Sequence, residues 1–250
     1  MPLDRSQLKA EARQRLRTAQ VNPYAFTLLL LLVTGLLSAA GTYASAPRIL
    51  ETYRRLQELS PGAALPLPYS VTFFASLPAL PSKAAVFLTV LSLLLGTLIR
   101  AGAALYHLGV FRGEEKPFST LLEGFGMAGK VILLAVLETV FVLLWSLLLY
   151  IPGIVAIYRY RFALYNLCEN PELSPLEAIR MSKAQTDGFK WKLFVLDLSF
   201  LGWRLLSSLT LSVLDIWLAP YVAQTDVGYF PTIKRLQGVG ALPQEPPAEG

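Results

Sequence analysis

Six charged residues that stand inside apolar stretches are the residues of this sequence most able to do chemistry. These residues are Glu138, Arg159, Arg161, Asp197, Arg204 and Asp215. A charged side chain at the centre of a bilayer costs about 2.5–3.5 kcal/mol on insertion scales, so each needs a partner or water. Asp197 and Arg204 are two helical turns apart and therefore share one face of a helix. We expect the six residues to form a polar core between membrane helices.

Two interpretations of this polar core are open. In the first, Glu138, Asp197 and the arginines line a cavity that binds an ion, a proton or a lipid headgroup. In the second, the same groups form buried ion pairs that hold the helices together. Buried ion pairs are weak evidence for stability, so the second interpretation does not displace the first.

A proline–glycine pair lies between two of the apolar stretches. Proline lacks the amide donor and crowds the preceding turn, so we expect Pro152 and Gly153 to end the helix before them. The pair forms either a plain turn between two spans or a broken helix of the kind that transporters use at their binding sites.

The residue types of the sequence give little support for catalysis or for metal binding. The single cysteine, Cys168, allows no internal disulfide and no cysteine-based zinc or iron–sulfur site. The single histidine, His107, excludes motifs that need two histidines. An intramembrane aspartyl protease needs acids on two facing spans, whereas Asp197 and Asp215 share one apolar stretch. We therefore expect no enzyme activity, no metal and no cofactor.

The composition predicts a membrane protein. Of 250 residues, 54% are hydrophobic and 16% are charged, against about 25% charged residues in soluble domains. The mean hydropathy is +0.50. The formal net charge of +5 is explained by basic residues that flank spans and face anionic lipid. We expect membrane lipids, and no nucleic acid, as partners.

The apolar stretches predict an all-α polytopic bundle of five or six transmembrane helices with interfacial helices. Three stretches approach or exceed the length that crosses a bilayer: 24–46, 84–99 and 130–150. The stretch 154–168 is either a fourth span or a tilted half-helix. The stretch 193–222 is either one long helix or two helices that meet near Ser207-Ser208. All these belong to a single membrane domain, residues 23–235.

The segments around the spans have distinct compositions. Residues 1–22 are basic, and their apolar stripe of Leu8, Ala12 and Leu16 predicts an interfacial helix on the cytoplasmic leaflet; a solvated tail is the alternative. Residues 47–83 form a proline-rich extracytoplasmic loop that is a candidate lid or partner surface. Residues 236–250 have the composition of a disordered tail.

A distinctive helix N-cap motif begins the polar segment 174–188. Ser174 is placed as the N-cap, a proline follows, and Glu177 completes the capping box. Arg180 and Lys183 make this helix too polar to insert, so we expect it at the cytoplasmic surface. It either docks a partner or anchors the connection between spans.

The distribution of lysine and arginine predicts the orientation. With five or with six crossings, most basic residues outside the spans lie on the cytoplasmic side if the N-terminus is cytoplasmic, in agreement with the positive-inside rule. We expect a multi-pass protein of the cell (cytoplasmic) membrane. The side of the C-terminus depends on the number of crossings.

One stretch, 143–203, carries a set of short motifs that recur together in a known family. These motifs are Trp145-Ser146-Leu147, Ile151-Pro152-Gly153-Ile154, Tyr158 with Tyr160, Asn170-Pro171, Glu177-Ala178-Ile179, Ser182-Lys183, Gly188 with Lys190-Trp191-Lys192, Leu196-Asp197-Leu198-Ser199-Phe200 and Gly202-Trp203. With Pro220-Tyr221 and Tyr229-Phe230, the stretch resembles the bacterial integral membrane family known as domain of unknown function 975, over roughly residues 80–235. A weaker likeness is to the membrane segment of some glycerophosphodiester phosphodiesterases.

Neither resemblance implies a chemistry. We expect a non-enzymatic membrane protein that recognises lipid, or an envelope or cytoplasmic protein, through its polar core and its cytoplasmic helix. The alternative is a small transporter, or a transporter subunit, that uses Glu138 and Asp197 as coupling carboxylates. The ligand and the oligomeric state are left open.

Overall fold

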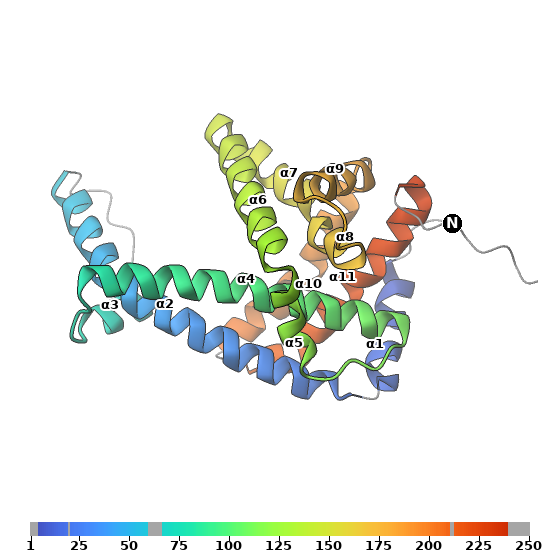
Figure 1. Cartoon of the computed structure of the whole chain (residues 1–250), viewed down its shortest axis with the longest axis horizontal. Coiled ribbons are helices and arrows are strands. Elements are labelled where there is room, and N and C mark those ends of the chain that lie inside the picture. The colour runs from blue at the N-terminus through green and yellow to red at the C-terminus, as the bar shows by residue number, and fades with distance from the viewer. Residues whose placement is uncertain (1–4, 20, 60–66, 211–212, 240–250) are drawn as a thin grey trace, which may run out of the picture. The chain divides into compact units, whose positions relative to one another are not determined.

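The computed structural model describes residues 5–19, 21–59, 67–210 and 213–239 (Figure 1). These residues are largely helical and include no β-strand, which confirms the predicted all-α class. The chain divides into two compact units. The larger unit consists of residues 1–30 and 98–250, and the smaller unit consists of residues 31–97.

The helices follow one another with short connections. In chain order they are α1 (Arg5–Thr18), α2 (Pro23–Leu59), α3 (Tyr69–Ala75), α4 (Ser82–Arg112), α5 (Thr120–Glu123), the 3-10 helix η1 (Gly124–Met127), α6 (Ala128–Leu148), α7 (Tyr150–Tyr160), α8 (Ala163–Glu169), α9 (Pro175–Gln185), α10 (Lys190–Leu209) and α11 (Asp215–Gln237).

Three helical segments of the described chain are long and apolar enough to cross a membrane: Pro23–Leu59, Ser82–Arg112 and Thr120–Leu147. At 1.5 Å per residue, α2 is about 55 Å long and α4 about 46 Å, which exceeds the hydrocarbon thickness of a bilayer. These helices indicate membrane association. The helices α7, α8, α10 and α11 do not meet the same criteria of length and composition, so the described residues supply three candidate spans where five or six were predicted.

The first span differs from its prediction at its C-terminal end. Helix α2 contains Pro47 and continues to Leu59, so part of the predicted loop 47–83 is helix. An internal proline removes one helical hydrogen bond, and in apolar helices such a gap is tolerated where other groups satisfy the freed backbone. Helix α3 and the start of α4 also fall within the predicted loop.

The break after α6 lies earlier than predicted. Leu149 has an extended backbone (φ −163°, ψ 150°) and separates α6 from α7. Pro152 is the third residue of α7, where its missing N–H has no intrahelical partner in any case. Pro152 and Gly153 therefore begin the second helix and do not end the first.

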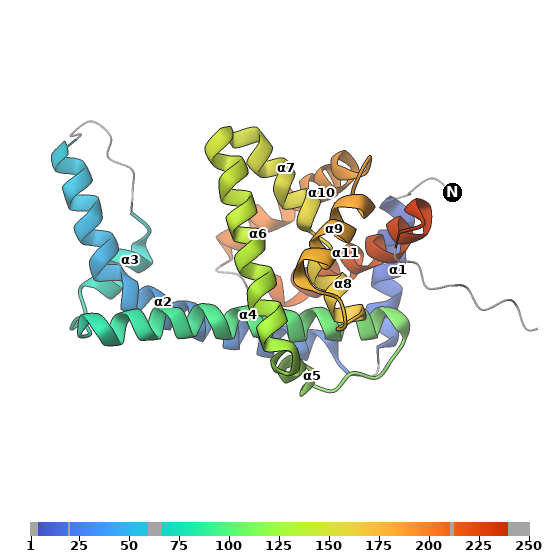
Figure 2. The ribbon, with the colours of Figure 1, turned by 45° about the horizontal axis from the view of Figure 1, so that its top comes forward.

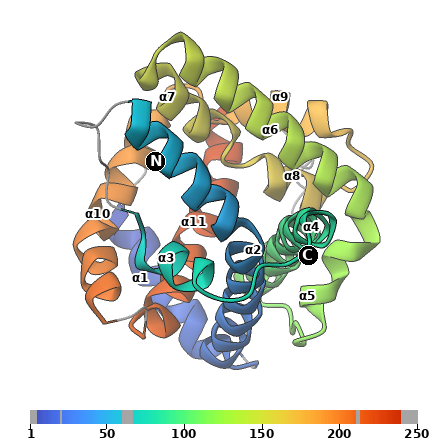
Figure 3. The same ribbon diagram turned by 90° about the vertical axis from the view of Figure 1, so that its left-hand side faces the viewer.

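Gly153 allows α6 and α7 to lie side by side, as Figures 2 and 3 show. A Cβ atom at this position would overlap the Ser146 Oγ atom and lie 3.1 Å from the Ser146 Cα atom. The helix pair can approach this closely only because residue 153 has no side chain.

The two later apolar stretches each form a pair of helices. The stretch 154–168 is split between α7 and α8, and the stretch 193–222 is split between α10 and α11. The two-helix alternative for 193–222 is therefore right, although the break follows Leu209. Helix α11 runs on to Gln237; of the predicted disordered tail, residues 240–250 lie outside the described residues.

The basic helix α1 packs on the protein. Leu8, Ala12 and Leu16, the predicted apolar stripe, are all buried, and α1 lies beside α11 (Figures 1 and 2). Leu8 contributes to the same core as Phe162 and Phe230. The predicted apolar stripe is thus buried against another helix, and the position of α1 relative to the lipid surface stays a prediction.

Helix α9 has the predicted cap. The Ser174 Oγ atom accepts a hydrogen bond from the Glu177 backbone N–H (3.3 Å), and a Glu177 carboxylate oxygen accepts one from the Ser174 N–H (2.8 Å). The helix buries Ala178 and Ile179 and exposes Glu177, Arg180 and Lys183. Both sets follow from the helical spacing of the sequence.

Candidate functional site

A cluster of charged side chains in the larger unit is centred on Arg161, which lies at the break between α7 and α8. Its two Nη atoms donate to the two carboxylate oxygens of Asp197 on α10, at 2.6 and 3.0 Å. Its Nε atom donates to Asp226 on α11, at 2.8 Å. The three side chains are only 15–23% exposed. Arg161 thus joins three elements of the fold.

Two tyrosines complete the cluster from the same segment as Arg161. The Tyr158 hydroxyl donates to Asp197 at 3.0 Å, and the Tyr165 hydroxyl donates to Asp226 at 3.5 Å. All three guanidinium nitrogens of Arg161 therefore donate, and all four carboxylate oxygens accept. A buried ion pair is stable only when its remaining polar atoms are satisfied in this way.

Most of the chain matches one known protein family. The family described as "Protein of unknown function (DUF975)" matches residues 1–165 and 147–237. The chain belongs to the DUF975 family. No curated protein and no solved structure matches it, and the likeness to glycerophosphodiester phosphodiesterases is not supported.

The DUF975 match begins earlier than the resemblance seen in the sequence. It includes α1, α2 and the smaller unit, and not only residues 80–235. The family description assigns no activity, so the chemistry of this DUF975 protein has to be argued from its side chains.

The predicted polar core is divided in the structure. Of the six predicted residues, Arg161 and Asp197 meet directly, and the exposed Arg204 interacts with Asp197 at longer range. Glu138 lies on α6 and interacts with Arg100 of α4. The side chains that bond Arg161 are thus those of Asp197 and Asp226, and Glu138 is not one of them among the described residues.

The two remaining predicted residues have other surroundings. Arg159 lies over the Trp145 ring, at 5.7 Å from its centroid, whereas Arg161 bonds Asp197 and Asp226. Asp215 is the first residue of α11. There its carboxylate is placed to interact favourably with the positive end of the helix dipole, and the break after Leu209 separates it from Asp197 and Arg204 on α10.

Asp226 was not among the predicted residues of the polar core. This residue lies beyond the apolar stretch 193–222, yet it belongs to α11. A signal was present, since Asp226 is the only charged residue between Ile216 and Ile233. An isolated acid in an apolar helix indicates a buried partner.

Uncharged polar pairs also link helices of this DUF975 protein. The Gln224 amide nitrogen donates to the His107 carbonyl at 3.1 Å and lies 3.2 Å from its Nδ1 atom. Asn166 and Gln185 exchange two hydrogen bonds of 2.9 Å. His107 is buried. These pairs join α4 to α11 and α8 to α9.

Two further features concern ligands. Among the described residues there is no group of three or more His, Cys, Asp or Glu side chains arranged to hold a metal ion. A small pocket of about 190 Å³ is lined by Arg5 of α1 and by Trp191, Lys192 and Val195 of α10. Trp191 is 71% exposed, and its ring stacks on Phe194 with centroids 5.1 Å apart.

Proposed function

We propose that this DUF975 protein is a non-enzymatic, multi-pass membrane protein that recognises anionic lipid headgroups. In this proposal the Arg161 cluster is a clamp between helices, and the headgroup binds in the pocket formed by Arg5, Trp191 and Lys192. The N-terminus, with α1, then lies on the cytoplasmic side of the cell membrane.

The proposal rests on one observation: the hydrogen-bonding capacity of the Arg161 guanidinium is used within the protein. Each guanidinium nitrogen already donates to a carboxylate of Asp197 or Asp226. A headgroup phosphate at this place would have to displace a carboxylate and would then face two negative charges. Recognition of an anion is therefore better supported at cations that form no ion pair with another described residue.

The pocket at Arg5 has the residue types of a headgroup site. Arg5 and Lys192 supply positive charge, and among the described residues no carboxylate lines the pocket. Trp191 is exposed, and indole side chains favour the boundary between headgroups and hydrocarbon. Each basic residue near an anionic surface contributes about 1 kcal/mol of attraction.

The test uses the full chain in nanodiscs of phosphatidylcholine that contain some phosphatidylglycerol, with bound lipid identified by native mass spectrometry. We expect Arg5→Gln/Lys192→Gln to lose phosphatidylglycerol relative to phosphatidylcholine. Arg17→Gln is the matched control, because Arg17 is an exposed cation of the same helix outside the pocket. Unchanged phosphatidylglycerol retention in the double variant would contradict the proposal.

A second candidate function is transport coupled to a proton or cation. It is favoured by the composition of the cluster, because two carboxylates share one guanidinium at a helix break. Proton flux into vesicles that contain the protein, measured with an enclosed pH dye, separates the two candidates. Flux that disappears in Asp226→Asn, in a protein that still melts like the wild type, would favour transport over the clamp.

A further inference from the structure

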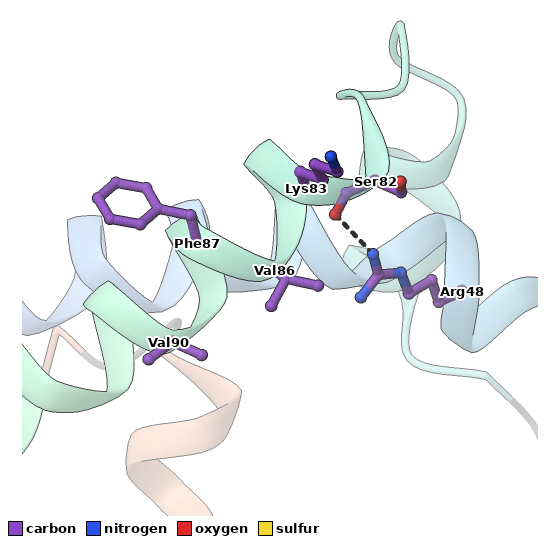
Figure 4. Close-up of a pocket in the computed structure, with 6 residues that line it drawn as sticks. All are labelled: Arg48, Ser82, Lys83, Val86, Phe87 and Val90. Carbon is purple, nitrogen blue, oxygen red and sulfur yellow. Dashed lines mark hydrogen bonds between the residues drawn. The ribbon is translucent and has the colours of Figure 1, made fainter.

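A groove lies in the smaller unit, between the C-terminal part of α2 and the first turns of α4. It has a volume of about 550 Å³ and is lined by Arg48, Ser82, Lys83, Val86, Phe87 and Val90 (Figure 4). The groove therefore combines two cationic side chains with an apolar wall. It shares no residue with the pocket at Arg5.

The cations stand where the uncharged segments end. Arg48 is the first charged residue after the start of α2 at Pro23, and Lys83 directly precedes the uncharged residues 84–99 of α4. Charged side chains at the ends of apolar helices lie at the level of the lipid headgroups. Both cations are thus at the depth of lipid phosphates if α2 and α4 cross the bilayer.

A hydrogen bond positions the Arg48 guanidinium. Its Nη2 atom donates to the Ser82 carbonyl at 2.8 Å, as Figure 4 shows. This bond ties the C-terminal part of α2 to the first residue of α4. It uses a neutral acceptor, so the positive charge of Arg48 is not neutralised by it.

The apolar wall extends from the cations into the uncharged segment. Val86 and Val90 are one helical turn apart on α4, and Phe87 lies beside them. These three side chains are 46%, 48% and 68% exposed. The wall runs from Lys83 toward Val90 along α4. An acyl chain whose headgroup lies at Lys83 would run the same way into the hydrocarbon.

The charge of the groove selects the kind of lipid. None of the described residues that line it is acidic. The nearby Glu51 of α2 is paired with Arg55 at 3.0 Å. The groove therefore has a net positive charge at the headgroup level, which favours an anionic phospholipid over a zwitterionic one.

We propose that this groove binds one anionic diacyl phospholipid, with its phosphate at Arg48 and Lys83 and an acyl chain along Val86, Phe87 and Val90. This lipid is additional to the headgroup recognised at Arg5 and Lys192. The two proposals fail separately, because each pair of cations can be changed without the other.

The test counts phosphatidylglycerol molecules retained by the full chain from nanodiscs of phosphatidylcholine and phosphatidylglycerol. We expect Arg48→Gln or Lys83→Gln to weaken phosphatidylglycerol binding about 5-fold and the double variant about 30-fold. Phosphatidylcholine retention should not change. The matched control is Arg54→Gln, an exposed cation of α2 that does not line the groove, and it should behave like the wild type.

A second pair of variants tests the acyl-chain part. Phe87→Ala should weaken phosphatidylglycerol binding several-fold, because a ring that covers the chain is removed. Leu93→Ala removes an equally exposed apolar side chain of α4 outside the groove and should have no effect.

Three results would overturn the proposal. One is wild-type phosphatidylglycerol retention in the Arg48→Gln/Lys83→Gln protein. Another is an equal loss in Arg54→Gln, which would indicate attraction to the general surface charge. The third is a dimer that dissociates in Phe87→Ala, which would assign the apolar wall to a second copy of the chain.

Discussion

The charged cluster of the larger unit and the groove of the smaller unit use arginine in opposite ways. Arg161 donates to two carboxylates and is largely buried, whereas Arg48 donates to a neutral carbonyl and is exposed. In the first arrangement, two carboxylates of the protein neutralise the positive charge of the guanidinium. In the second, the guanidinium keeps its positive charge and can attract an anionic ligand. Charge that is satisfied internally indicates a structural role, and charge that is oriented but not neutralised indicates a binding role.

The largest expected effect breaks the cluster. Arg161→Leu leaves the carboxylates of Asp197 and Asp226 close together without their shared cation, and we expect a loss of about 3–5 kcal/mol in the free energy of unfolding. Thermal unfolding in detergent measures it. The control is the triple change of Arg161, Asp197 and Asp226 to leucine, which removes all three charges and should recover most of the loss. An unaltered melting temperature in Arg161→Leu would show that the cluster is not a clamp.

The next prediction compares the packing around one glycine in each of the two units. Gly153→Ala places a Cβ atom against Ser146 in the larger unit, and we expect about 1–3 kcal/mol of destabilisation from overpacking. Gly96→Ala is the matched change in the smaller unit, where the added Cβ meets no neighbour within 4 Å beyond the adjacent residues and the local helix backbone. Gly96→Ala should be neutral or slightly stabilising. Equal losses in both variants, measured by thermal unfolding, would contradict the close contact of α6 and α7.

A smaller effect concerns the cap of α9. Ser174→Ala should cost about 1 kcal/mol, since the Glu177 backbone N–H loses its acceptor. Hydrogen bonds from Ser174 lower the pKa of Glu177 below its ordinary value. A lowered pKa in the folded state means that this contribution is present above the unfolded-state pKa and is lost as the pH falls through the folded value.

The pH dependence gives this prediction a separate control. The difference in unfolding free energy between the wild type and Glu177→Gln should shrink when the pH is lowered from neutral to below the usual carboxyl range. A difference that stays constant with pH would mean that the charge of Glu177 does not support the cap.

The smallest expected effect on stability is that of replacing Arg48. Because its side chain is exposed and bonds a carbonyl, Arg48→Gln should change the free energy of unfolding by less than about 0.5 kcal/mol. Unfolding in detergent without added phosphatidylglycerol measures this change. A large loss there would make Arg48 a structural residue like Arg161 and would weaken the case for a lipid site.

Local features of the fold could be predicted. The buried stripe of Leu8, Ala12 and Leu16 and the cap of Ser174 and Glu177 follow from spacing within a few residues. Helix ends within apolar stretches were less predictable. Pro152 was expected to end a helix, but a proline in the first turn costs no hydrogen bond, so the break could lie at Leu149.

The sequence by itself determined the all-α class, the long apolar helices and the amphipathic faces of α1 and α9, because these depend on composition and on contacts within one helical turn. Only the tertiary structure decided which charges meet. Arg161 and Asp226 are 65 residues apart, and their pairing depends on breaks after α7 and α10 that divide the stretches 154–168 and 193–222 among four helices. No local pattern encodes such a distance, since it results from the packing of whole helices against one another.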